Sequence, residues 1–282
     1  RGASVSAVGT HEKRIAGVTI DAQDCRRTLN AAMVIDATGS GNIAAMAGAE
    51  FELAAPDKRQ LAGFVFQVRG MNGVDESLGL KVPYHLAQAV KQGIFSSEVK
   101  YTTFIPGDDH DEGFCKMSIA AEAGPDRDEA AKKAAKKIHE YLSSVIPAFQ
   151  GSSLVGTSLR VLDREGRRIT GLYTLTKDDV LAARKFSDGV VKNAWPVELW
   201  DREKGTIYQY VPRGDYYEIP FRCLQAKGIS NLLAAGRCIS VTSEALGSTR
   251  VMGTCLSLGE QAGRAAAYHV KTGKYPEPIK GL

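Results

Sequence analysis

Paired cysteines, long apolar runs and a strong excess of one charge are all missing from this sequence of 282 residues. Its five cysteines are scattered and odd in number, which favours a reducing, cytoplasmic location over a disulfide framework. No stretch approaches the ~20 apolar residues that a membrane helix needs, because even the alanine-rich segment near the C-terminus contains Glu260, Gln261 and Arg264. We therefore expect a protein without a membrane partner.

The charge balance argues against nucleic acid as a partner. The 36 basic and 32 acidic residues are mixed along the chain and leave a formal charge of only +4. Lysines 132, 133, 136 and 137 do cluster, but they occupy one side of an expected helix, where a solvated face explains them. With 44% hydrophobic residues, the chain has the composition of a globular protein with a large core.

Common catalytic and metal-binding motifs are also missing. The sequence contains neither a G-x-S-x-G elbow nor H-E-x-x-H, and its five histidines are dispersed. An acidic cluster at residues 108–112 lacks the spacing of a calcium-binding loop, so we interpret it as a solvated hairpin turn. We predict no metal site.

A glycine-bearing turn near the N-terminus is the first informative motif. The apolar run at residues 31–35 predicts a buried strand, which continues into Asp36-Ala37-Thr38-Gly39-Ser40-Gly41 and then into a short helical pattern ending near Gly48. A strand, tight turn and helix present backbone N–H groups to a ligand, although glycines in ordinary turns give the same pattern.

Residues 34–42 also resemble the first motif of methyltransferases that use S-adenosylmethionine. Such an enzyme needs a second strand that ends in an acidic residue. Asp57 lies at a suitable distance, but no apolar strand precedes it, and the C-terminal motifs would remain unexplained.

The middle of the chain has a different pattern of predicted secondary structure. Strand candidates separated by polar turns suggest a largely antiparallel sheet, at residues 63–69, 98–105, 113–120, 154–162, 206–211 and 216–220. One amphipathic helix is expected among them, beginning with a capping box formed by Asp126 and Glu129.

The C-terminal part again contains a strand followed by a helix. A strand is expected at residues 229–235, followed by Gly236-Arg237 and then by a long helix within residues 247–272. We predict an α/β fold, α+β overall. A partial Rossmann-like domain made of residues 1–50 and 226–282 would be interrupted by a mainly antiparallel β domain at residues 51–225.

Taken in order, these motifs resemble FAD-dependent oxidoreductases of the glutathione-reductase type, with a fumarate-reductase-like layout. The similar segments are residues 34–51, 167–188 and, most specifically, 217–267 (YEIPFRCLQAKGISNLLAAGRCISVTSEALGSTRVMGTCLSLGEQAGRAAA). The resemblance implies an enzyme that transfers hydride between a small-molecule substrate and FAD, with the middle domain as a substrate-covering cap.

The resemblance also implies roles for particular residues. Contacts with FAD fall to Ala37, Thr38, Gly39, Gly236, Arg237, Gly247, Val251, Met252, Gly253 and Thr254. Arg250 takes the position closest to substrate, where a fixed positive charge binds a carboxylate or stabilises a transition state, and Arg222 is a second catalytic candidate. A salt bridge explains either arginine equally well.

One departure from the family pattern affects the cofactor. The family begins with a βαβ unit that carries G-x-G-x-x-G, and no such motif occurs here, since Gly39 and Gly41 are followed by Ala44. The chain opens at Arg1 without a methionine, which suggests a fragment. Otherwise a second polypeptide supplies the missing unit, or the chain is a non-catalytic remnant that binds no flavin.

Overall fold

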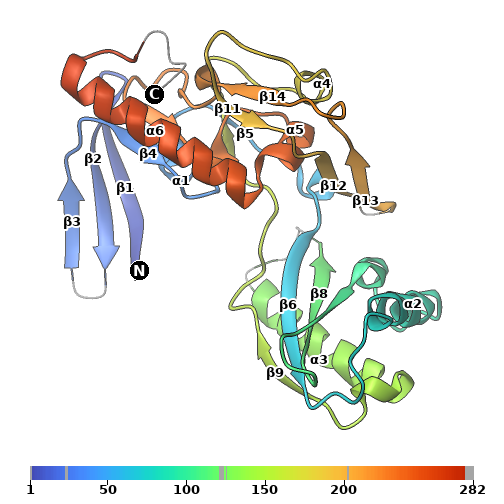
Figure 1. The fold of residues 1–282 in the computed structure, drawn as a ribbon. Coiled ribbons are helices and arrows are strands. Elements are labelled where there is room, and N and C mark those ends of the chain that lie inside the picture. Colours follow the sequence, from blue (N-terminus) through green and yellow to red (C-terminus); the bar gives the residue numbers. More distant parts are fainter. Residues whose placement is uncertain (1, 23–24, 121–123, 125, 202, 277–282) are drawn as a thin grey trace. The chain divides into compact units, whose positions relative to one another are not determined.

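A computed structural model describes residues 2–22, 25–120, 124, 126–201 and 203–276. The chain forms two compact units, which we describe separately. Unit 1 contains residues 1–55, 165–199 and 206–282, and unit 2 contains residues 56–164 and 200–205. The fold is α+β, with small sheets and helices in both units (Figure 1).

Unit 1 begins with an antiparallel meander of β1 (Ala3–His11), β2 (Arg14–Ala22) and β3 (Cys25–Leu29). The next strand, β4 (Val34–Asp36), pairs in parallel with β15 (Leu232–Ala234), from the far end of the sequence. The buried side chain of Asn231 joins the two sheets, because its amide bonds to Ile15 in β2 and to the carbonyl of Ala32. This link fixes the amino end of β15.

Three further strand pairs and four helices complete unit 1, apart from residues 200–205 in the last strand pair, which belong to unit 2. The pairs are β5 (Phe51–Glu52) with β10 (Arg168–Ile169), β11 (Gly189–Asn193) with β14 (Tyr217–Pro220), and β12 (Val197–Asp201) with β13 (Gly205–Gln209). The helices are α1 (Asn42–Met46), α4 (Lys177–Leu181), α5 (Ser243–Thr249) and α6 (Met252–Thr272). Helix α6 packs against β4, β11 and β15 through its buried residues Leu258, Ala262 and Ala265 (Figure 1).

Unit 2 is a four-stranded antiparallel sheet with two long helices. The strand order is β7-β8-β6-β9, from β6 (Ala62–Arg69), β7 (Thr103–Pro106), β8 (Gly113–Ile119) and β9 (Ser153–Thr157). The helices α2 (Leu78–Lys91) and α3 (Arg127–Val145) bury their apolar stripes in the same core as the sheet, for example at Leu86 and Ile138.

Short 3-10 turns connect several of these elements. They lie at Pro56–Lys58, Ser97–Tyr101, Pro147–Phe149, Phe221–Cys223 and Gly236–Cys238. The helices within the described residues include none that is long and apolar enough to cross a membrane.

Two local expectations differ from the structure. Helix α2 was not among the expected elements, and it contains Pro83, a residue that usually breaks a helix. Helix α3 does follow Asp126, but the Asp126 side chain accepts no capping hydrogen bond and Glu129 pairs with Lys132 instead. The expected capping box is therefore wrong, although the expected apolar face is buried at Ala131, Ala135, Ile138 and Leu142.

The boundaries of the units also differ from the expected 51–225 insertion. Residues 165–199 and 206–225 belong to unit 1 because their strands fill its core, with Ile169, Val191 and Ile219 all buried there. Alternation of apolar residues predicts a strand, but it does not show in which of the two cores that strand packs.

Candidate cofactor site

The carboxyl ends of β4 and β15 bring two glycine-bearing turns together. The strands run in parallel with Leu233 opposite Ile35 and Ala234 opposite Asp36. Beyond the pairing, the Ala235 N–H donates to the carbonyl of Asp36 at 3.0 Å, so both chains leave the sheet side by side. Ligands of open α/β sheets lie off this end of the strands.

The buried carboxylate of Asp36 shapes the first turn. Its Oδ1 accepts hydrogen bonds from the Thr38 N–H at 3.0 Å and the Thr38 hydroxyl at 2.7 Å, and its Oδ2 accepts from the Ala44 N–H at 2.9 Å. The Thr38 hydroxyl oxygen in turn accepts from the Asn42 N–H at 3.0 Å. This network holds residues 37–41 as a turn that enters α1, and it leaves Ala37 and Thr38 exposed.

The second turn lies directly against the first. A β-carbon added to Gly39, which has a φ of +74°, would be 2.9 Å from Nη2 of Arg237. The Cys238 thiol is 3.7 Å from the Asp36 carbonyl oxygen, and burial raises its pKa to about 11. Cys238 is thus a protonated core residue, while the Arg237 guanidinium spans the gap between the turns.

A third segment, residues 165–168, braces the first turn from another side. Gly166 is so close that a β-carbon there would be 3.2 Å from the Gly39 carbonyl oxygen. Arg167 donates to the Ser40 carbonyl at 3.3 Å and to Asn42 Oδ1 at 3.1 Å. Sequence reasoning missed this support, although Arg167 opens one of the segments with family resemblance.

The same segment carries a buried ion pair. Arg168 lies 3.4 Å from Glu165, and it donates to the Val241 carbonyl at 2.9 Å. Glu165 also accepts a hydrogen bond of 2.7 Å from the Ser243 hydroxyl at the start of α5. These bonds attach α5 to the segment that braces the first turn.

The C-terminal helical region is two helices rather than the one expected. Helix α5 ends at Thr249, Arg250 follows, and Val251 is extended, with φ −70° and ψ 150°, before α6 begins. Gly247 lies inside α5, where a β-carbon would be 2.7 Å from the Glu198 carbonyl oxygen. Close packing of α5 on β12 accounts for this glycine, so we no longer assign it to the cofactor.

The first turn of α6 lies beside the second glycine turn. A β-carbon on Gly236 would be 3.7 Å from the Cys255 thiol, one turn into α6. Met252 and Gly253 are exposed, whereas Thr254 is buried. The N–H groups of a first helical turn have no partner within the helix and carry partial positive charge, which suits a phosphate or another electron-rich group.

Arg250 is a buried cation at the junction of these helices. Only 11% of its side chain is exposed, and Nη2 donates to the Glu198 carbonyl at 3.1 Å, with Glu198 Oε1 at 3.9 Å. Burial lowers the pKa of Arg250, against the opposing charges of Glu198 and Glu165. The positive charge of Arg237 lowers the pKa of Arg250 further, in the same direction as burial.

The sequence profile of the family described as FAD dependent oxidoreductase matches residues 1–281. The chain belongs to this family. A search of curated protein sequences gives no match.

Several solved structures have a similar chain path, at low sequence identity. A geranylgeranyl bacteriochlorophyll reductase-like protein from Thermoplasma acidophilum is 10% identical, with a TM-score of 0.48, over 98% of this chain and 51% of that one. A flavin-dependent brominase variant is 12% identical, with a TM-score of 0.42, over 98% and 53%. The p-nitrophenol 4-monooxygenase of Pseudomonas putida is 9% identical, with a TM-score of 0.42, over 98% and 51%. The chain spans about half the length of these proteins.

The family cofactor is FAD, and the residues at the two turns fit part of it. The predicted contact residues Ala37, Thr38, Gly39, Gly236 and Arg237 lie at one end of the β4–β15 pair, as the sequence analysis expected of the two turns. No G-x-G-x-x-G turn exists in the sequence, so the glycine-rich helix start that usually cradles the pyrophosphate is not among these residues.

Arg222, the other arginine predicted to be catalytic, is held by an aspartate. Its Nε and Nη2 donate to the two carboxylate oxygens of Asp188 at 2.9 and 3.1 Å. Burial raises the pKa of Asp188, but the hydrogen bonds from the Arg222 guanidinium and N–H outweigh it, so the pKa falls below its ordinary value. We assign Arg222 a structural role.

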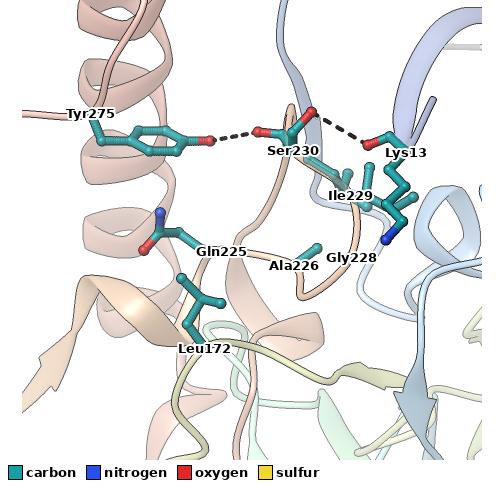
Figure 2. A pocket seen from close by; sticks show the side chains of 9 residues that line it. Lys13, Leu172, Gln225, Ala226, Gly228, Ile229, Ser230 and Tyr275 are labelled. Atoms are coloured by element: carbon teal, nitrogen blue, oxygen red, sulfur yellow. Dashed lines mark hydrogen bonds between the residues drawn. The ribbon is translucent and has the colours of Figure 1, made fainter. Parts of the chain in front are cut away.

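A hollow of about 310 Å³ lies at the opposite end of β15 (Figure 2). Its lining includes Gln225, Ile229, Ser230 and Tyr275, and the Tyr275 hydroxyl points to the Ser230 carbonyl at 3.5 Å. Residues 228–230 precede the strand, so this hollow is at the amino end, away from the glycine turns. We do not assign the cofactor to it.

The acidic cluster at residues 108–112 forms the hairpin turn between β7 and β8. Arg69 lies 3.0 Å from Asp109 and 2.6 Å from Glu112, and the Gly70 N–H donates to Asp111 at 3.3 Å. Neutralisation by Arg69 explains two of the carboxylates. Among the described residues, no group of histidines, cysteines and carboxylates has the arrangement of a metal site.

Asp57, the residue that a methyltransferase would need after its second strand, lies in the 3-10 turn Pro56–Lys58. The strand before it, β5, has two residues and pairs antiparallel with β10. The local structure thus offers no support for that alternative.

Proposed function

We propose that this chain carries the flavin-facing part of an FAD-dependent oxidoreductase that acts on a small-molecule substrate. The observation that carries the proposal is the meeting of Gly39 and Gly236 at the carboxyl ends of β4 and β15, beside the first turn of α6. Three chain segments with small residues and accessible backbone there suit a flat cofactor.

We assign the cofactor contacts as follows. Ala37, Thr38 and Gly39 would line the dinucleotide part of FAD, and Gly236 with Arg237 would follow the ribityl chain and pyrophosphate. The backbone of residues 251–254 would face the flavin pyrimidine edge, where helix N–H groups favour negative charge. When bound, FAD supplies a two-electron acceptor for a substrate C–H bond. Arg250 would then orient the substrate and oppose negative charge that develops on it.

A further segment, upstream in the same protein or in a second polypeptide, would supply the ADP-binding βαβ unit. Within the described residues β4 pairs with β15 alone, and a parallel sheet of two short strands is normally extended and covered. Helix α6 also presents Met252 and Leu256, which are 83% and 75% exposed, and open space beside Gly259 and Gly263. A βαβ unit offers a strand for the edge of β4 and a helix for this face of α6.

Titration with FAD tests the proposal. The purified chain is mixed with FAD, with and without a peptide chain that contains a G-x-G-x-x-G βαβ unit from the complete protein, and flavin fluorescence and absorption are recorded. We expect binding only in the second mixture. Absence of binding in both mixtures would favour a non-catalytic remnant.

A surface variant makes the test specific. Leu256→Glu places a charge on the exposed face of α6 and should weaken assembly with the βαβ unit by at least ~10-fold, a cost of about 1.4 kcal/mol. Leu159→Glu is the matched control, because Leu159 is an exposed leucine of unit 2. Equal assembly of the two variants would contradict docking on α6.

A further inference from the structure

Two exposed tyrosines form a flat surface at the end of β13. Tyr208 lies in the strand and Tyr210 lies two residues later, so both rings fall on the same side of the chain. Their centroids are 6.2 Å apart and their planes differ by 23°, an offset stacked arrangement. Tyr208 is 47% exposed and Tyr210 is 71% exposed, whereas tyrosine side chains in folded proteins are on average more buried.

Arg250 is close to this tyrosine pair. Glu198, which accepts its hydrogen bond, lies in β12, the pairing partner of the strand that carries Tyr208. The charges of Arg250 and Tyr208 also influence each other: burial and Glu198 raise the pKa of Tyr208, and Arg250 opposes them. Arg250 is therefore bonded to the strand that pairs with the one carrying Tyr208.

The Arg250 guanidinium has donors to spare. Nη2 makes one hydrogen bond, to a neutral carbonyl, and the Glu198 carboxylate at 3.9 Å is beyond hydrogen-bond distance. Among the described residues, the other nitrogens of Arg250 donate no hydrogen bond. A buried guanidinium in this state is a strong site for a carboxylate, which matches its planar fork with two parallel bonds.

We propose that Tyr208, Tyr210 and Arg250 form the substrate site, and that it takes a planar ring that bears one carboxylate. The ring would lie on the tyrosines, whose exposed faces offer offset stacking, and the carboxylate would pair with Arg250. The Glu198 carboxylate, 3.9 Å from Nη2 of Arg250, would disfavour a second negative charge beside the arginine. This inference rests on the proposed function, because it names the class of molecule that the enzyme would act on.

The experiment compares benzoate with benzamide, an uncharged molecule of the same shape. Each is titrated into the purified chain without FAD, and binding is followed by saturation-transfer NMR of the ligand. We expect benzoate to bind at least ~10-fold more tightly than benzamide, which corresponds to one charge-assisted hydrogen-bonding contact. Equal affinities, or no binding of benzoate, would overturn the proposal.

Variants separate the two parts of the site. Arg250→Gln should reduce the benzoate preference to about one, and Tyr210→Ala should weaken both ligands by ~5-fold or more. Tyr84→Ala, at an exposed tyrosine of unit 2, is the matched control and should change nothing. If Arg250→Gln does not fold, the effect of Tyr210→Ala and the ratio of benzoate to benzamide affinity in the unmodified chain still test the proposal. Since the titration contains no FAD, its result is independent of the FAD-binding test of the proposed function.

Discussion

The Arg237 guanidinium lies against Gly39, close enough that a β-carbon at Gly39 would be 2.9 Å from its Nη2. This contact joins the turn after β4 to the turn after β15, although most of the sequence lies between them. The glycine is required mainly by its φ of +74°, because a guanidinium at the end of a flexible side chain can move aside. The contact between Gly39 and Arg237 thus shows that the two turns lie together, as the proposed cofactor site requires.

Asp36→Asn should destabilise unit 1. An amide in place of the carboxylate turns an N–H donor toward the Ala44 N–H, or toward Thr38 if it is flipped, and leaves a buried donor without an acceptor. We expect the free energy of unfolding to fall by ~1–3 kcal/mol, measured by urea denaturation. Asp57→Asn, at an exposed position, is the control. An unchanged midpoint for Asp36→Asn would mean that the network does not hold the turn.

Gly247→Ala and Gly259→Ala should have opposite effects on the stability of the isolated chain. At Gly247 the new methyl group meets the backbone of Glu198 at 2.7 Å, and overpacking costs ~1–3 kcal/mol. At Gly259, in the middle of α6, it meets nothing within 4 Å, and helix propensity should add ~0.5–1 kcal/mol. Thermal unfolding of both variants checks the signs. Stabilisation by Gly247→Ala would disprove the close approach of α5 to β12.

The Arg222–Asp188 pair should contribute stability that depends on pH. The native pKa of Asp188 lies below its ordinary value, so the contribution is complete above the unfolded pKa of ~3.9 and is lost as pH falls through the lower native pKa. A double-mutant cycle with Asp188→Asn and Arg222→Gln should show a coupling of at most ~1 kcal/mol near pH 7, since solvent screens the partly exposed pair. The coupling should vanish at strongly acidic pH. Persistence there would show that the contact is not ionic.

Arg250→Ala should impair turnover far more than Arg222→Ala. In the complete, FAD-loaded enzyme we expect a loss of ~100-fold for Arg250→Ala if the guanidinium acts on the transition state. Arg222→Ala should lower the unfolding midpoint and leave turnover within ~3-fold, because its guanidinium is engaged with Asp188. Steady-state rates with both variants check the difference. Equal losses of turnover in the two variants would indicate that Arg222 also acts in catalysis.

Local patterns predicted most of the strands and one face of α3, but not every element. The apolar stripe of α3 and the alternation in β6 are signals within one segment, so they are visible without a structure. Helix α2 was not predicted, and it contains Pro83. The separate helix α5 was not predicted either, because no local signal marks the break at Arg250 and Val251 before α6. In both cases tertiary packing outweighs the local preference of the chain.

The supporting residues of the candidate site were the least predictable part. Glycine-bearing turns after apolar strands pointed to Gly39 and Gly236. Nothing local marks Gly166 and Arg167 as neighbours of the first turn, or Glu198 as the partner of Arg250. These residues contact the site only because β10 and β12 enter the core of unit 1. The role of Gly247 was likewise invisible, since it depends on the backbone of a distant strand.

Short segments of the sequence show where strands end in glycine-bearing turns and which family those turns resemble. Which turns meet, and whether an arginine bonds to an aspartate or to a main-chain carbonyl, follows from packing between remote segments. Hydrogen bonds and ion pairs need distances of about 3 Å between atoms, and remote segments reach such distances only once the chain has packed.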